Sequence, residues 1–177
     1  PLYLPMLSSP VEYAPTAADL PIPPYTMGQL IANGHLSGNS TVLTPNPDDV
    51  QHILDKLSSE NIRVGAHHQY GSSVRLNLLG LRAQTRALGI DVRSADKFIP
   101  APYMTAKPSE RVALLHGLMD GDGSISATRN KVTYHTTSQR LASDVRALVE
   151  SIGGIASVRI YERAHQDKPA EYQVRIR

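Results

Sequence analysis

Two aspartates at the end of an apolar segment are the residues of this 177-residue chain with the clearest chemical potential. Residues 114–123 read LLHGLMDGDG, so Asp120 and Asp122 follow the last apolar turn of an expected helix. A carboxylate there faces the negative end of the helix dipole, which costs roughly 0.3–1 kcal/mol. A divalent cation with oxygen ligands would offset both charges. The pattern favours a metal site, although Asp-Gly-Asp-Gly also fits a plain helix stop.

A weaker copy of this segment lies upstream and indicates an internal duplication. Residues 27–34 read MGQLIANG, and both of their glycines lie 89 residues before a glycine of the later segment. Each copy has two small residues four positions apart: Gly28 and Ala32 in the first, Gly117 and Gly121 in the second. Such residues let two helices pack with their backbones nearly in contact. We therefore expect the two helices to pair, which places Asn33 beside Asp122.

The later segment resembles the signature motif of the LAGLIDADG homing endonucleases, in the form that carries two motifs in one chain. The flanking phrases PVEY (10–13), ADLP (18–21) and KFIP (97–100) resemble those of the endonuclease domains of inteins. The resemblance covers about residues 10–177. It implies an α+β fold: a pseudo-twofold pair of αββαββ(α) halves with two central packed motif helices and antiparallel sheets that face DNA.

The resemblance also implies site-specific, metal-dependent hydrolysis of DNA phosphodiesters, with Asp122, Asn33 and Lys97 as the catalytic set. In the family, the acids matched here by Asp122 and Asn33 hold the divalent ions, Mg²⁺ or Mn²⁺. Asparagine keeps a carbonyl oxygen but lacks the charge, so we expect cleavage to be weakened, restricted to nicking, or lost. Lys97, in KFIP, matches a lysine associated with catalysis; a linker lysine in solvent is the alternative.

Excess positive charge lies on segments that read as strands. Residues 61–77 contain two arginines and no acid, whereas 124–137 and 155–177 together contain seven basic and three acidic residues. In 131–137, polar side chains alternate with Val132 and Tyr134, which is typical of a strand with one buried face. The opposite face could lie in a DNA groove or be merely solvated. The expected DNA contacts are Arg63, His67, Gln69, Arg75, Arg129, Lys131, His135, Arg159, Tyr161, Arg163, Arg175 and Arg177.

The chain divides into an arm, two halves and a linker. We expect residues 1–24 to be an arm from a neighbouring splicing domain, 25–100 the first half, 101–108 a linker and 109–177 the second half. Helices are expected at 78–88, 109–120 and 138–152, and strands at 124–127, 131–137, 156–163 and 171–177. The second half lacks a counterpart of the helix at 78–88, so we expect it to be truncated.

Composition excludes several classes of protein. The chain has no cysteine, so it has no disulfide, thiolate zinc site or cysteine nucleophile. It has no apolar run of about 18 residues, and its start lacks a basic signal-peptide region. We expect a cytoplasmic monomer whose partners are double-stranded DNA and the splicing domain of the same precursor. The alternative is a DNA-binding module that does not cleave, as in WhiA-type regulators; Asp122 and Lys97 favour the enzyme, and Asn33 favours the module.

Overall fold

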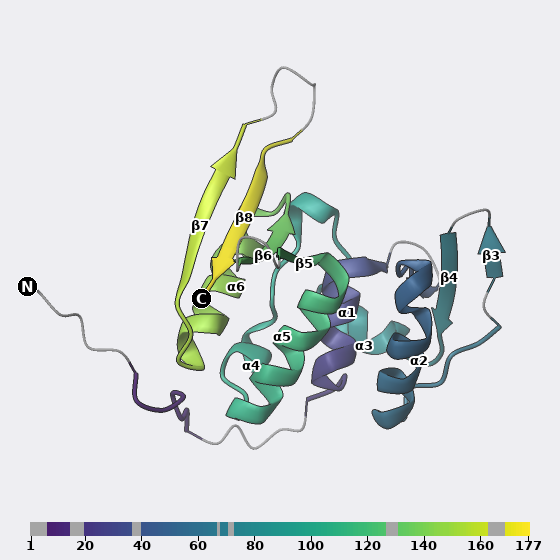
Figure 1. The fold of residues 1–177 in the computed structure, drawn as a ribbon. Helices are drawn as coiled ribbons and strands as arrows, with labels where there is room; N and C mark the ends of the chain where they lie inside the picture. Colours follow the sequence, from purple (N-terminus) through teal and green to yellow (C-terminus); the bar gives the residue numbers. More distant parts are fainter. Residues whose placement is uncertain are drawn as a thin grey trace, which may run out of the picture.

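Two similar sets of helices and strands follow one another along the chain, as the computed structural model shows (Figure 1). The structure describes residues 7–14, 20–36, 40–66, 68–70, 73–126, 131–162 and 169–177. The first half contains α1 (Pro24–Asn33), β1 (Gly34–His35), β2 (Thr41–Leu43), α2 (Val50–Ser59), β3 (His68–Tyr70), β4 (Ser73–Leu78) and α3 (Arg82–Ala87). After α4 (Ala101–Met104), the second half contains α5 (Pro108–Asp122), β5 (Gly123–Ser126), β6 (Lys131–Thr136), α6 (Gln139–Ser151), β7 (Ala156–Tyr161) and β8 (Glu171–Ile176).

Both halves form an antiparallel four-stranded sheet with the same topology. The strand orders are β1-β2-β4-β3 and β5-β6-β8-β7. The register repeats as well, because Gly34 pairs with Leu43 in the first sheet and Gly123 with Tyr134 in the second. In each half, the motif helix runs directly into the first strand at a glycine. The expected pair of related halves with two packed central helices is therefore confirmed.

Helices α1 and α5 lie side by side between the two sheets (Figure 1). Proline occupies the first turn of each helix, where its missing N–H costs nothing. The carboxylate of Glu60 accepts hydrogen bonds from the backbone N–H groups of Tyr25 and Thr26 and so caps the start of α1. A Cβ added at Gly28 would lie 2.3 Å from the Leu114 carbonyl oxygen, so the two backbones are in contact. This confirms the packing expected from the paired small residues.

One apolar core joins the two halves. Met27 and Leu30 of α1 pack with Leu114 and Leu118 of α5, and all four are fully buried. On either side, an amphipathic helix covers one face of each sheet. Ile53 and Leu57 of α2 are buried in the first half; Leu141, Val145 and Leu148 of α6 are buried in the second. The opposite sheet faces are thus left for polar side chains.

Several expected boundaries were wrong for local reasons. The helix expected at 78–88 begins only at Arg82, because Leu78 pairs in β4 and Gly80 makes a turn with φ +83°. The linker 101–108 contains the short helix α4. Helix α5 reaches Asp122 rather than residue 120, and β5 begins at Gly123. The turn expected at 128–130 lies outside the described residues. No helix in the described part of the chain is long and apolar enough to span a membrane.

Part of the expected arm packs against the second half. The Val11 N–H donates to the Ser151 carbonyl oxygen at 2.8 Å, at the end of α6. Arg111, which is fully buried, donates to the Val11 carbonyl oxygen, and its guanidinium lies 5.1 Å from the centre of the Tyr13 ring. Residues 11–13 are therefore attached to the body of the second half. The boundaries of the arm and of the two halves as separate domains stay predictions.

Candidate catalytic site and DNA-facing sheet

The ends of the two central helices meet at equivalent positions. Asn33 is the last residue of α1, and Asp122 is the last residue of α5. A Cβ added at Gly121 would lie 2.3 Å from the Ala32 Cβ and 3.2 Å from the Asn33 amide nitrogen. The Asn33 side chain therefore lies against the residue that precedes Asp122. The expected approach of the two motif ends is present.

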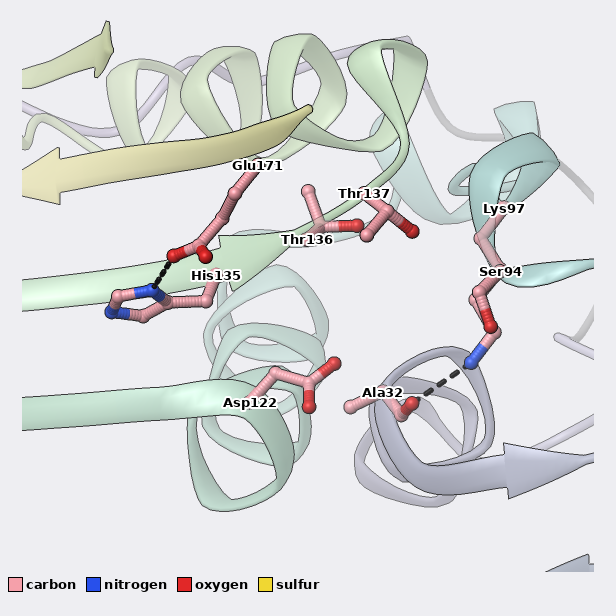
Figure 2. A pocket seen from close by; sticks show the side chains of 8 residues that line it. All are labelled: Ala32, Ser94, Lys97, Asp122, His135, Thr136, Thr137 and Glu171. Atoms are coloured by element: carbon pink, nitrogen blue, oxygen red, sulfur yellow. Dashed lines mark hydrogen bonds and ion pairs between the residues drawn. The ribbon is translucent and has the colours of Figure 1, made fainter. Parts of the chain in front are cut away.

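Asp122 faces a cavity of about 400 Å³ at this junction (Figure 2). Figure 2 shows its carboxylate directed toward the space between Ala32 and the side chain of Lys97. The lining comes from α1, α5, two strands of the second sheet and the segment before α4: Ala32, Ser94, Lys97, Asp122, His135, Thr136, Thr137 and Glu171. Segments far apart in the sequence thus meet around one carboxylate.

Lys97 lies in this cavity and not in solvent. Its Nζ donates to the Ala32 carbonyl oxygen at 2.8 Å, at the negative end of α1. Its own carbonyl oxygen accepts from the Ser138 hydroxyl at 2.6 Å, which fixes the segment against the start of α6. Burial lowers the pKa of Lys97 below its usual value, and the charge of Asp122 opposes that shift.

The charge of Asp122 is balanced by neighbours within the protein. Burial raises the pKa of this carboxyl above its usual value, against the opposing effects of Lys97 and His135. Burial also raises the pKa of Tyr134, with a further contribution from Asp122. The carboxylate is therefore held in a partly desolvated site with an ammonium group as its counter-ion.

Asp120 does not join Asp122. Its Oδ2 accepts a hydrogen bond from the Tyr25 hydroxyl at 2.9 Å and lies 3.0 Å from the His52 Nε2. The expectation that both aspartates would share one cation was wrong, because residues two positions apart on a helix do not face each other. Asp120 instead links α5 to α1 and α2.

The residues present fit one divalent ion but not two. No group of three or more His, Asp or Glu side chains in the described part of the chain could hold a metal ion. Asp122 is the one carboxylate at the paired helix ends, where Asn33 contributes a neutral amide. Mg²⁺ is commonly held by one or two carboxylates and completed by water and substrate phosphates. One ion shared with DNA is compatible with this donor set, and a two-ion centre is not.

The second sheet carries the expected polar face. Residues opposite one another in an antiparallel sheet share a face. The register places Thr133 opposite Arg175, His135 opposite Gln173 and Tyr161 opposite Glu171. The Arg175 Nη2 donates to the Tyr161 hydroxyl at 3.1 Å. The predicted contacts on this face are Lys131, His135, Arg159, Tyr161 and Arg175, and Arg177 follows at the exposed end of β8.

The first sheet gathers fewer of the predicted contacts. Arg75 is exposed on β4, and Arg63 is exposed before the bridge at Val64. The register sets His68 opposite Arg75, whereas the predicted contact Gln69 pairs with the buried Val74. The other predicted contacts, His67, Arg129 and Arg163, lie outside the described residues.

Sequence reasoning missed a hydrogen-bonded cluster beside Asp122. His135 Nδ1 lies 2.7 Å from the Glu171 Oε1, and the Gln173 Nε2 donates to the same oxygen at 3.2 Å. The His135 Nε2 lies 3.1 Å from the Thr133 hydroxyl and 3.2 Å from that of Ser124. Alternation in EYQVRIR (171–177) places Glu171 and Gln173 on the face of Arg175, so this signal was present in the sequence.

Comparison with known proteins identifies the fold. Residues 109–177 match the family model of the LAGLIDADG-like domain. The chain resembles the structure of I-DmoI in complex with DNA and Mn, with a TM-score of 0.59, 14% identity and coverage of 89% of each chain. It resembles the N-terminal LAGLIDADG domain of DUF199/WhiA with a TM-score of 0.60 and 12% identity, covering 91% of this chain and 78% of that one. The architecture is therefore that of the LAGLIDADG homing endonucleases. Other I-DmoI structures contain DNA with Ca, or were obtained with target DNA in the presence of Mg.

Two curated proteins match parts of the chain. The replicative DNA helicase DnaB of Mycobacterium intracellulare is 32% identical over 142 residues, which is 77% of this chain and 21% of that protein. The DNA gyrase A protein of Mycolicibacterium flavescens is 36% identical over 83 residues, which is 45% of this chain and 15% of that protein. The chain thus spans about a fifth or less of the length of either relative.

Proposed function

Since the chain has the LAGLIDADG fold, we propose that it is the site-specific DNA endonuclease domain of an intein, and that it cuts one strand of its target. The observation that carries this proposal is the single carboxylate at the paired helix ends. Asp122 stands at the end of α5, and its counterpart on α1 is the neutral Asn33. Two strands would need two organised phosphates, and this chain provides charge for one.

Asp122 and phosphate oxygens of the DNA would hold one Mg²⁺ or Mn²⁺, which would polarise the phosphodiester and lower the pKa of a bound water. The chain's own residues position the reaction. Lys97 keeps an ammonium group 2.8 Å from the Ala32 carbonyl oxygen, inside the same cavity. A fixed cation there stabilises the negative charge that develops on the phosphate during hydrolysis.

The DNA would lie along the polar face of the second sheet. Lys131, Arg159 and Arg175 share this face, and the cavity of Asp122 opens beside it through His135 and Glu171. Basic side chains on a sheet supply phosphate contacts, and polar ones between them can reach base edges. Because one chain supplies both central helices, we propose that it acts as a monomer.

The intein context is supported by the two curated relatives. A replicative helicase and a gyrase protein are named for different activities, yet similarity to the same chain occupies 21% of one and 15% of the other. A module inserted into unrelated host proteins produces this pattern. Splicing would then belong to a neighbouring domain of the precursor.

A second candidate is DNA binding without cleavage. The Lys97 ammonium already bonds to the Ala32 carbonyl and neutralises Asp122, so the helix ends offer little net negative charge to a divalent ion. The fold is also shared by the N-terminal LAGLIDADG domain of WhiA.

Plasmid cleavage separates the two candidates. A supercoiled plasmid would carry the chain's own gene with the coding sequence of the insert removed, and would be incubated with protein and Mg²⁺ or Mn²⁺. We expect nicked circles that depend on the ion and disappear with Asp122→Ala. Retarded DNA without any nicking supports the binding module, and no retention of this site over random DNA contradicts both.

A further inference from the structure

We propose that Glu171 is a specificity residue that recognises the amino group of a cytosine in the major groove, next to the phosphate faced by Asp122. This inference rests on the proposed binding of DNA to the second sheet. It assigns a base-reading role to a carboxylate, the side chain least suited to general contact with a polyanion.

Glu171 is placed among DNA-facing groups. It begins β8 opposite Tyr161 and shares the face of Arg175. It also lines the cavity of Asp122, as Figure 2 shows. Among the described residues of the four strands, it is the one acidic side chain on this face. A base it contacts would therefore lie close to the reacting phosphate.

A carboxylate at this position needs a favourable partner in the complex. DNA phosphates repel it, so its approach to DNA is unfavourable unless a donor on a base meets it. In the major groove cytosine presents the N4 amino donor, whereas guanine and thymine present acceptors that a carboxylate repels. Adenine pairs its amino donor with the N7 acceptor, which makes it a poorer partner for a group with two acceptor oxygens.

The side chain is held in advance of binding. The Nδ1 of His135 and the Nε2 of Gln173 both lie within hydrogen-bond distance of the Glu171 Oε1, at 2.7 and 3.2 Å. A carboxylate has about four acceptor sites, so a base amino group can be added to these donors. The Glu171 side chain is 20% exposed, which leaves it accessible but restrained. Holding it in place lowers the entropy lost on binding.

The first sheet has no equivalent of this carboxylate. Tyr134 pairs with Val174 in the second sheet, as Leu43 pairs with Leu76 in the first. Glu171 lies three residues before Val174, and the residue three before Leu76 is Ser73. The base-reading group and the remaining catalytic carboxylate are thus in the same half, which links recognition to the strand that is cut.

The test begins with selection of bound duplexes from a randomised library by the wild-type protein. We expect the selected sequence to contain a cytosine whose preference is lost with Glu171→Ala. Affinity of Glu171→Ala for the selected duplex should fall roughly tenfold or more, since a good base contact discriminates by that factor. Removal of a merely repulsive carboxylate would instead strengthen binding, so the sign of the change decides.

Two comparisons make the result specific. Glu162→Ala removes the same charge at an exposed position just after β7 and should leave the selected sequence unchanged. Replacing the selected cytosine by 2-pyrimidinone, which lacks the amino group, should weaken wild-type binding about tenfold and leave Glu171→Ala binding unaffected. The DNA change needs no protein variant, so it stands even if Glu171→Ala does not fold.

Equal or tighter binding of the selected duplex by Glu171→Ala, or wild-type indifference to 2-pyrimidinone, would overturn the proposal. A wild-type protein that enriches no sequence would contradict site-specific DNA binding itself. The two failures are therefore distinct.

Discussion

Gly117→Ala should disrupt the contact on which the fold depends. The added Cβ would lie 2.1 Å from the Tyr25 carbonyl oxygen and 3.1 Å from the Gln29 nitrogen, both backbone atoms of α1. The first distance is about 1.4 Å shorter than ordinary van der Waals contact. Backbone atoms cannot rotate away, so α1 and α5 must separate and the fully buried Leu114 and Leu118 lose neighbours.

The expected loss can be estimated from two opposing terms. Overpacking of a tight contact costs about 1–3 kcal/mol, and the rigid backbone on both sides places this one near the upper end. Replacing glycine by alanine inside a helix otherwise gains about 1 kcal/mol. The net change in the free energy of unfolding should therefore be a loss of about 2 kcal/mol.

Urea denaturation followed by far-UV circular dichroism measures this change. His116→Ala is the matched control, because His116 is the exposed neighbour in the same helix and a similar propensity gain applies without the clash. The control should be as stable as the wild type or slightly more so. A Gly117→Ala protein with unchanged or increased stability would show that the two helices do not pack through these glycines.

Three further predictions follow from the same contacts. Because burial raises the folded pKa of Asp122 above its unfolded value of 3.8, the wild type should lose stability relative to Asp122→Asn as pH rises from that value through the folded pKa, measured in chelator; a pH-independent difference would contradict this. Arg159→Ala with Arg175→Ala should weaken duplex binding and reduce the salt slope by about 0.9 for each lost phosphate contact, whereas an unchanged slope would mean that this face is only solvated. Arg111→Met should cost about 2 kcal/mol or more in urea denaturation, since it leaves the carbonyls of Ala106, Ser151 and Val11 without their buried donor; wild-type stability would contradict that role.

The helix pair was predictable because its cause is local and repeated. Two glycine motifs at the same spacing in both copies indicate a close contact between backbones, and few other structures use such a pattern. The common topology of the two sheets followed from the duplication and from alternation in segments such as 131–137. Bounds were less accurate: Leu78 has the pattern of a helix start but is used by β4.

The site was predictable only in part. The neighbouring acids Asp120 and Asp122 are equivalent by composition, and only the helix phase and the partners Tyr25 and His52 separate them. Lys97 was found through the family resemblance, since no local pattern shows that its ammonium reaches the Ala32 carbonyl 65 positions away. Glu171 was missed because a search for DNA contacts favours basic residues, although the alternation in its strand indicates its face.

The conversion of nicking to double-strand cutting tests the central claim most directly. Asn33→Asp restores a carboxylate at the second helix end, and the plasmid carrying the uninterrupted site reports the products with Mg²⁺ or Mn²⁺. One carboxylate in the wild type predicts nicked circles that persist, and two carboxylates in Asn33→Asp predict linear DNA. Efficient linearisation by the wild type, or nicked circles alone from a folded, DNA-binding Asn33→Asp protein, would contradict the account.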